Sequence, residues 1–200
     1  CVYITVMTLV LIEGLNVKCF AAGIGCVGGV LVAGALELLL RDQIKMSGVL
    51  DSEWLYLYNL RKDNPIDLKA IIFAMIIVGA VGAVMDVAMS IASSLCEINE
   101  KSPDLPAREL LKSGLTIGRD IMGTMANTLV LAYIGSALCC MLLMVTYSSN
   151  VSQILNREQI AVEILQALAG SIGILAALPL TAITSVLCLK PLNRIKRRVH

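Results

Sequence analysis

Histidine is almost absent from this chain of 200 residues, aromatic residues are few, and the net charge is small. The single histidine, His200, is the last residue, which argues against His-based catalysis and His-ligated metals. Aromatic residues make up 4% of the chain, too few for stacking platforms, and the net charge of +1 provides no global field for nucleic acid. We therefore expect no metal, no cofactor and no nucleic-acid partner.

Catalytic and cofactor motifs are missing as well. The seven cysteines include no C-x-x-C pair, and no P-loop or nucleophile–base pair is visible, so we expect no enzymatic activity. The stretch Gly23-Ile-Gly25-Cys-Val-Gly28 spells G-x-G-x-x-G but lies inside an apolar run of helix length. A dinucleotide site needs a preceding strand, so close helix packing is favoured here, together with Gly29 and Gly34.

Apolar residues, in contrast, are abundant: 58% of the chain is hydrophobic, 16% is charged, and the mean hydropathy is +0.83. Soluble chains contain about 45–50% apolar and about 25% charged residues, so this composition indicates a membrane protein. A spanning helix needs about 20 mostly apolar residues. Four segments meet this requirement, at 17–40, 68–95, 120–147 and 160–189.

The sequence therefore predicts one all-α polytopic transmembrane domain over 1–200. The chain begins at Cys1, and we expect 1–12 to be the tail of a truncated span. Gly135 allows a break in the third span. Asp104, Pro106 and Gly114 fit the cap, first turn and end of a short interfacial helix over 104–114. Its leucines, Leu105, Leu110 and Leu111, would then face the bilayer.

Lysine and arginine in the connections set the expected orientation. The C-terminal tail, 190–200, carries five of these residues, and 96–119 carries four. Cytoplasmic loops are enriched in Lys and Arg. We therefore expect a cytoplasmic C-terminus.

Small and polar residues fall on one face of three predicted spans. In the second span and its end they are Gly79, Gly82, Asp86, Ser90, Ser93 and Glu97. Around the start of the third they are Thr116, Asp120, Thr124, Asn127 and Thr128. In the fourth they are Glu163, Gln166, Gly170, Gly173, Ala177, Thr181 and Thr184. We expect these faces to meet, with Gly79, Gly82, Gly123, Gly170 and Gly173 as packing positions, because small residues let helices approach closely.

Asp86 is the most informative residue, because it lies well within its span and no Lys or Arg shares its depth. A carboxylate at the centre of a membrane helix costs about 2.5–3.5 kcal/mol, and such groups are functional by default. A carboxyl that is costly to ionise and reachable by water can load and release protons. The structural alternative is a neutral Asp86 that bonds to Thr124, Asn127 or Thr128 across the helix interface.

The other polar candidates have two readings each. Asn127 and Thr128 position the Asp86 proton or simply hydrogen-bond between helices. Arg119 and Asp120 line a proton exit or form an interfacial charge pair that anchors the helix end. Glu37 and Glu163 lie near span ends, and we expect both to snorkel to the interface.

Two stretches resemble a known family. Gly82-Ala-Val-Met-Asp86-Val-Ala-Met-Ser-Ile-Ala and Ile117-Gly-Arg-Asp-Ile-Met-Gly-Thr-Met-Ala-Asn127-Thr-Leu-Val-Leu-Ala-Tyr are similar to the YibE/F-like bacterial membrane proteins. Gly170-Ser-Ile-Gly173 and Pro179-Leu-Thr181-Ala extend the match. The resemblance implies a multi-pass protein of the bacterial cytoplasmic membrane whose relatives have more N-terminal sequence.

A more distant resemblance concerns the order of features. An Asp within a helix, an amphipathic cytoplasmic link and a span opening with Asp, Asn and Thr are similar to the C-terminal half of SecD or SecF, in the RND superfamily. By this resemblance Asp86 corresponds to a proton-relaying aspartate, and Asn127 and Thr128 to a polar pair. The chain lacks a large outer domain and half of an RND unit, so a homodimer or a paired membrane subunit is implied.

Two functions are compatible with these residues. The first is a proton-linked transporter or energy-coupling subunit, in which Asp86 carries the proton. The second is a structural or assembly subunit whose polar faces only hold helices together.

Overall fold

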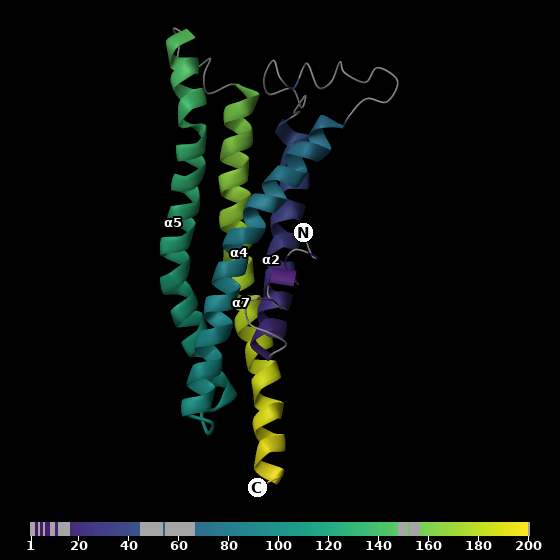
Figure 1. The fold of residues 1–200 in the computed structure, drawn as a ribbon, viewed down its shortest axis with the longest axis vertical. Helices are drawn as coiled ribbons and strands as arrows, with labels where there is room; N and C mark the ends of the chain where they lie inside the picture. The colour runs from purple at the N-terminus through teal and green to yellow at the C-terminus, as the bar shows by residue number, and fades with distance from the viewer. Residues whose placement is uncertain are drawn as a thin grey trace.

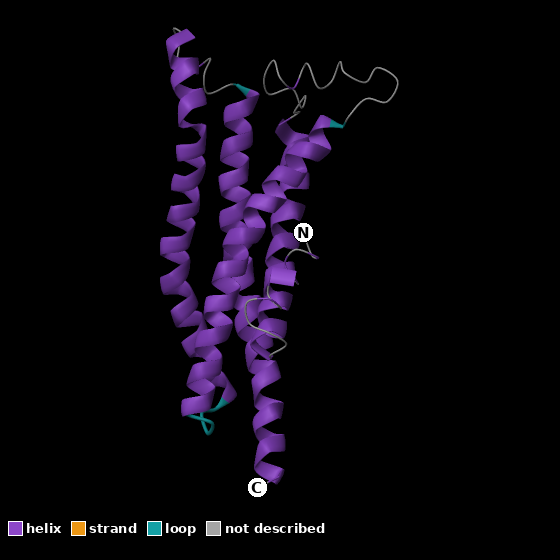
Figure 2. Ribbon diagram, in the orientation of Figure 1, coloured by secondary structure: helices purple, strands orange, loops and turns teal. Residues whose placement is uncertain are grey.

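The computed structural model describes residues 17–44, 67–147 and 157–199, together with residues 3, 5, 7, 8, 11, 54 and 152. These residues form four long helices, and no strand occurs among them (Figures 1 and 2). The helices are α2 (Val17–Ile44), α4 (Leu68–Lys101), α5 (Ala107–Tyr147) and α7 (Glu158–Val199).

The expected number of complete spans is confirmed. Each of the four helices contains a stretch long and apolar enough to cross a membrane, and the described part of the chain is all-α. The partial span expected over 1–12 lies mostly outside the described residues.

The third span differs from the sequence prediction. Helix α5 runs without interruption from Ala107 to Tyr147, so it contains no separate interfacial helix ending at Gly114 and no break at Gly135. Gly114 is a packing position, because a Cβ atom placed there would lie 2.8 Å from a Leu95 methyl group. Leu110 is fully buried, and Leu105 and Leu111 pack against the same core rather than facing the bilayer. Burial against α4 therefore extends the helix through a residue that would otherwise end it.

Local signals explain where α4 begins and where it turns into α5. The Asp67 carboxylate accepts hydrogen bonds from the backbone N–H groups of Lys69 and Ala70, at 3.1 and 3.2 Å. These bonds satisfy two donors that a helix start leaves free. At the other end the Ser102 N–H donates to the Ile98 carbonyl, at 2.9 Å, and Pro106 directly precedes α5. The result is a tight antiparallel hairpin of α4 and α5.

Helix α7 lies at the centre of the bundle and contacts α2, α4 and α5. Its closest crossing is with α2, where a Cβ atom on Gly29 would lie 2.7 Å from the Gly173 carbonyl oxygen. The Thr184 hydroxyl also donates to the Ala21 carbonyl across this crossing, at 3.2 Å. Small residues at membrane helix interfaces permit such backbone approach. Gly25 and Gly28 also lie directly against α7, so the glycine-rich segment of α2 serves helix packing, as the sequence predicted.

Helix α5, in contrast, lies at the edge of the bundle (Figure 1). Only 6% of its most apolar stretch is buried, compared with 44–50% in the other three spans. Its outward side chains include Leu131, Leu138 and Leu142, each more than half exposed. This helix therefore presents most of its circumference to whatever surrounds the chain.

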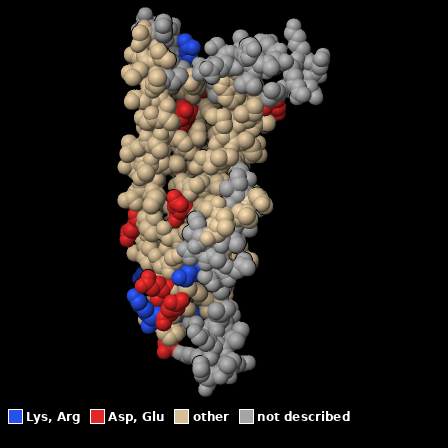
Figure 3. All heavy atoms as spheres, in the orientation of Figure 1, with Lys and Arg blue, Asp and Glu red and all other residues tan. Residues whose placement is uncertain are grey.

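The start of α2, the α4–α5 turn and the end of α7 lie at the same end of the bundle (Figure 1). The Lys190 ammonium donates a hydrogen bond to the Leu105 carbonyl and so ties α7 to the turn. Charged side chains gather at this end, whereas the band above it is mostly uncharged (Figure 3). One end of the bundle is therefore polar, as expected of a membrane–water boundary.

Candidate functional site

The predicted site residues lie on the outer surface of the α4–α5 hairpin. Asp86 on α4 is exposed within this chain. The residues Arg119, Asp120, Asn127 and Thr128 on α5 are exposed as well. The polar faces of α4 and α5 therefore do not turn into the bundle, which corrects the expectation that all three polar faces meet. The interior positions of α4 are taken instead by Val84, Val87, Ala88 and Ile91, which pack against α2, α5 and α7.

The hairpin places these residues at similar depths. Gly114 contacts Leu95 and Gly118 contacts Ile91. Moving four residues towards the C-terminus of α5 therefore corresponds to moving four residues towards the N-terminus of α4. Continuing this register brings Gly123 level with Asp86. Asp120 is within about one helical turn of that depth, since a helix rises about 1.5 Å per residue. In Figure 3 acidic side chains reach the surface within the otherwise uncharged band.

The hydrogen bonds between Asp86 and α5 that the structural alternative requires are not formed in the described part of the chain. The Thr128 hydroxyl donates to the Thr124 carbonyl of its own helix at 2.9 Å, and the Thr124 hydroxyl donates to the Ile121 carbonyl at 2.8 Å. Such back-bonding within a helix satisfies Thr without a second helix. Within the described part of the chain, the Asp86 carboxylate has neither a hydrogen-bond donor nor an ion-pair partner.

Arg119 and Asp120 do not lie at the end of a helix, where the sequence placed them. Helix α5 begins at Ala107, twelve residues before Arg119. No ion pair joins the two neighbouring side chains; the ion pair seen among the described residues is Lys101–Glu97, at 2.7 Å. Both side chains are exposed on the outer surface of the hairpin.

The five glycines proposed for packing divide into two groups. Gly173 lies against α2 and α4, Gly170 against Leu129 of α5, and Gly79 against the Tyr133 hydroxyl. Gly82 and Gly123, in contrast, have no described residue within 4 Å of a Cβ atom placed on them. These two bring none of the four described helices together, and they lie on the same exposed surface of the hairpin as Asp86.

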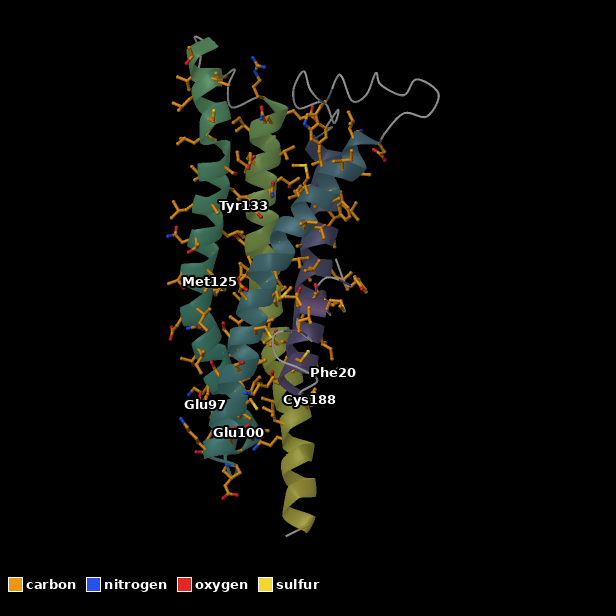
Figure 4. All side chains as sticks on the ribbon, in the orientation of Figure 1. Phe20, Glu97, Glu100, Met125, Tyr133 and Cys188 are labelled. Atoms are coloured by element: carbon orange, nitrogen blue, oxygen red, sulfur yellow. The ribbon has the colours of Figure 1, made fainter. Side chains whose placement is uncertain are left out.

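Two carboxyl groups behave differently from the sequence expectation. Glu37 is completely buried in the bundle, and Glu163 is half-buried with its Oε2 atom enclosed. Neither side chain snorkels to water. The sequence places Glu163 on the polar face of α7, which favours burial against other helices. It also places Glu163 near a span end, and the prediction of snorkelling followed from that second feature. The sequence analysis did not identify Tyr133 as a candidate residue, because an isolated tyrosine in an apolar run belongs to no motif or periodic pattern. Figure 4 shows it between α5 and α7.

We use the name hairpin belt for the exposed residues Gly82, Asp86, Arg119, Asp120, Gly123, Asn127 and Thr128. Among the described residues the belt joins a carboxylate without a partner, a second acid, a guanidinium and an amide, on the exposed surface of two helices that are apolar enough to cross a membrane. Within the described part of the chain, no group of three or more His, Cys, Asp or Glu residues is arranged to hold a metal ion.

In a comparison with known families, the model of the YibE/F-like protein family matches residues 1–191. Comparisons with curated proteins and with solved structures give no match. The more distant resemblance to SecD and SecF therefore has no support from these comparisons.

Proposed function

The chain belongs to the YibE/F-like family and is a multi-pass membrane protein, and we propose that it is a proton-linked transporter or energy-coupling subunit. The observation that carries this proposal is the exposed, unpartnered carboxylate of Asp86 in the apolar band of α4. A carboxylate facing lipid is costly, and intramembrane carboxylates face a protein interior or a water-filled path. Asp86 therefore needs an environment that the described residues do not give it.

Each residue of the hairpin belt has a role in this proposal. Asp86 takes up and releases the proton. Asn127 and Thr128 supply polar atoms that position its carboxyl group once the belt is covered. Asp120 and Arg119 continue the polar path on α5, about one helical turn away from Asp86 in depth.

The covering of the belt is a second membrane subunit, either a second copy of this chain or a paired protein. Gly82 and Gly123 have open space around them, which lets another helix approach the belt closely. This arrangement agrees with a half-unit of the RND type, which is completed only by its other half. The hairpin itself departs from that pattern, because the expected interfacial link is part of α5.

Charge supports an orientation for the protein. The two Lys/Arg-rich segments expected on the cytoplasmic side, 96–119 and the tail from 190, lie at one end of the bundle, where Lys190 bonds to the α4–α5 turn. Cytoplasmic connections are rich in Lys and Arg. We therefore place this end and the C-terminus in the cytoplasm, with the protein in a bacterial cytoplasmic membrane.

The alternative is a structural or assembly subunit. The open space around Gly82 and Gly123 favours it equally, because a belt built only for subunit packing has the same shape. The two functions differ in what they require of Asp86. A packing role tolerates the isosteric, uncharged Asn, whereas a proton carrier does not.

The decisive experiment compares wild type with Asp86→Asn in liposomes under an imposed pH gradient, with internal pH followed by an enclosed dye. We expect wild type to move protons and Asp86→Asn to be at least about tenfold slower, since Asn cannot ionise. Glu97→Gln is the matched control, because Glu97 is an exposed acid on the same helix that pairs with Lys101 outside the belt. Asp86→Glu, which keeps the ionisable group, should retain transport. Equal rates for wild type and Asp86→Asn would leave the structural subunit as the function.

A further inference from the structure

The exposed face of α5 carries all the charge of this helix. Its charged residues are Arg108, Glu109, Lys112, Arg119 and Asp120, and all five are exposed. The ion pair seen among the described residues, Lys101–Glu97, includes none of them. Within the part of the chain that the structure describes, these five charges therefore have no ion-pair partner.

Helical rotation sorts the five charges into two flanks. Each residue turns an α-helix by about 100°, so Thr116 and Gly123 lie on one line along the middle of the exposed face. The residues on one side of this line form the basic flank, which consists of Arg108, Lys112 and Arg119. The residues on the other side form the acidic flank, which consists of Glu109 and Asp120.

The neighbouring helices show where each flank lies in the bundle. Gly114 of α5 lies against Leu95 of α4, and Leu129 of α5 lies against Gly170 of α7. Counted around the helix from these contacts, the acidic flank is on the α4 side of α5 and the basic flank is on the α7 side. The exposed Asp86 of α4 is therefore on the same side as the acidic flank.

The line between the two flanks is open to another helix. A Cβ atom placed on Gly123 would have no described residue within 4 Å. The Thr116 hydroxyl donates to the Lys112 carbonyl of its own helix at 3.0 Å, so it needs no donor or acceptor from elsewhere. Small residues let membrane helices approach closely. Because α5 lies at the edge of the bundle, nothing described blocks this approach (Figure 1).

A membrane restricts how a second copy can approach this line. Copies of one chain insert in the same orientation, so the α5 helices of a twofold dimer run parallel about an axis normal to the membrane. About such an axis the basic flank of each copy faces the acidic flank of the other. Arg119 and the partner's Asp120 then differ by one residue in depth, about 1.5 Å. Lys112 and the partner's Glu109 differ by three residues, about 4.5 Å.

We propose that a second copy of this chain covers the hairpin belt in a parallel twofold dimer, in which Arg119 of each copy pairs with the partner's Asp120. Charge favours a second copy over another protein or lipid, because this chain carries both members of the pair at the matching depth. The same contact brings Arg119 of the partner subunit to the side of α5 on which Asp86 lies. The inference rests on the proposed function in one respect, since it names the subunit that covers the belt.

The test is copurification of two differently tagged copies of the full-length protein, coexpressed and transferred into nanodiscs. We expect wild-type copies to copurify. Arg119→Asp sets acid against acid at both contacts, and Asp120→Arg sets Arg against Arg. We therefore expect each variant to copurify with itself at least about tenfold less than wild type does. Coexpression of the two variants with each other restores opposite charges at both contacts and should recover copurification.

A crosslink tests the same dimer without changing any charge. Thr116→Cys keeps a side chain of similar size on the middle line, where equal residues of the two copies face each other. Oxidation should join the copies through this cysteine, since the helices approach closely enough for a disulfide. Wild type is the control, because its exposed Cys139 lies on another side of α5 and should form no such link.

Several results would overturn the proposal. Wild-type copies that do not copurify would show that another protein or lipid covers the belt. Unchanged copurification of both charge variants with themselves, or no recovery when the two are mixed, would remove the Arg119–Asp120 pairing, provided that circular dichroism shows intact helices. Where a charge variant does not fold, a Thr116→Cys protein that crosslinks no more than wild type decides against the dimer.

This proposal and the transport function fail separately. A dimer with the expected charge pairing that moves no protons would remove the transport function and leave the dimer standing. Proton movement by a protein whose copies do not copurify would do the reverse.

Discussion

Two glycines in neighbouring helices illustrate how the same residue type serves different surfaces. Gly29 of α2 lies against the Gly173 backbone, Ala177 and Val84, so a methyl group there would meet atoms on three sides. Gly82 of α4 has open space around its Cα hydrogen. The residue type is identical, and the surroundings alone decide whether a larger side chain is tolerated.

A matched pair of substitutions tests this difference. We expect Gly29→Ala to destabilise the bundle by about 1–3 kcal/mol, the usual cost of overpacking a close contact. Gly82→Ala should leave the stability of the single chain unchanged or slightly raised, because Ala favours helix over Gly by roughly 0.5–1 kcal/mol. Thermal unfolding in detergent, followed by circular dichroism, measures both. A Gly29→Ala protein as stable as Gly82→Ala would contradict the observed α2–α7 crossing.

At the scale of the element, the two ends of α4 are set by polar contacts rather than by its apolar sequence. Asp67 caps its start through two backbone N–H groups, and the Ser102 turn closes its end. Apolar composition alone does not say where the helix begins or ends, and these local polar contacts do.

The cap gives a prediction for this helix. Asp67→Ala removes the acceptor of both bonds, and we expect it to cost about 0.5–2 kcal/mol of stability. Asp67→Asn keeps an acceptor oxygen and should lose much less. Hydrogen exchange of the amides of Lys69 and Ala70 is the local measurement, and it should become faster in Asp67→Ala. Unchanged exchange at both amides would mean that the cap does not hold the start of α4.

Helix α5 differs from α4, because it is longer and packs against other helices on one side only. Its 41 residues span about 60 Å, roughly twice the hydrocarbon thickness of a bilayer. The first turns pack on α4 through Leu110 and Gly114, and a middle stretch packs on α7 through Leu129 and Tyr133. The remaining circumference is free for lipid on its leucine-rich part and for a partner along the hairpin belt.

At the scale of the whole molecule, the hairpin belt predicts an assembly. A second copy of this chain offers the same belt, and a twofold arrangement lets each belt cover the other. Removing several polar side chains from lipid in one contact would drive this proposed assembly.

Oligomeric state in nanodiscs, measured by mass photometry, checks this assembly. We expect wild type to be a dimer and Gly123→Leu to shift at least about tenfold towards the monomer, because the added side chain occupies the space for the approaching helix. Leu138→Phe is the control, since Leu138 is 53% exposed on the same helix and lies outside the belt. A monomeric wild type, or a dimer untouched by Gly123→Leu, would show that another protein or lipid covers the belt.

The sequence by itself determined the four long apolar helices of the described residues and the packing role of Gly25, Gly28 and Gly29. These features depend on local properties, namely the length of apolar runs and the small size of glycine. The cap at Asp67 is also a local feature, although no periodicity singled it out. The resemblance carried by the segments around Asp86 and Asn127 agrees with the family match over 1–191.

Only the tertiary structure decided which way each face points. Helices α2 and α7 pair through glycines, and the aliphatic face of α4 joins them, so the face of Asp86 is turned outwards. The same choice buried Glu37, enclosed Glu163 Oε2 beside Tyr133 and merged 107–114 into α5. The periodicity of a helix defines its faces, but the competition between neighbouring helices assigns each face to protein or to lipid, and that competition is not a property of any one segment.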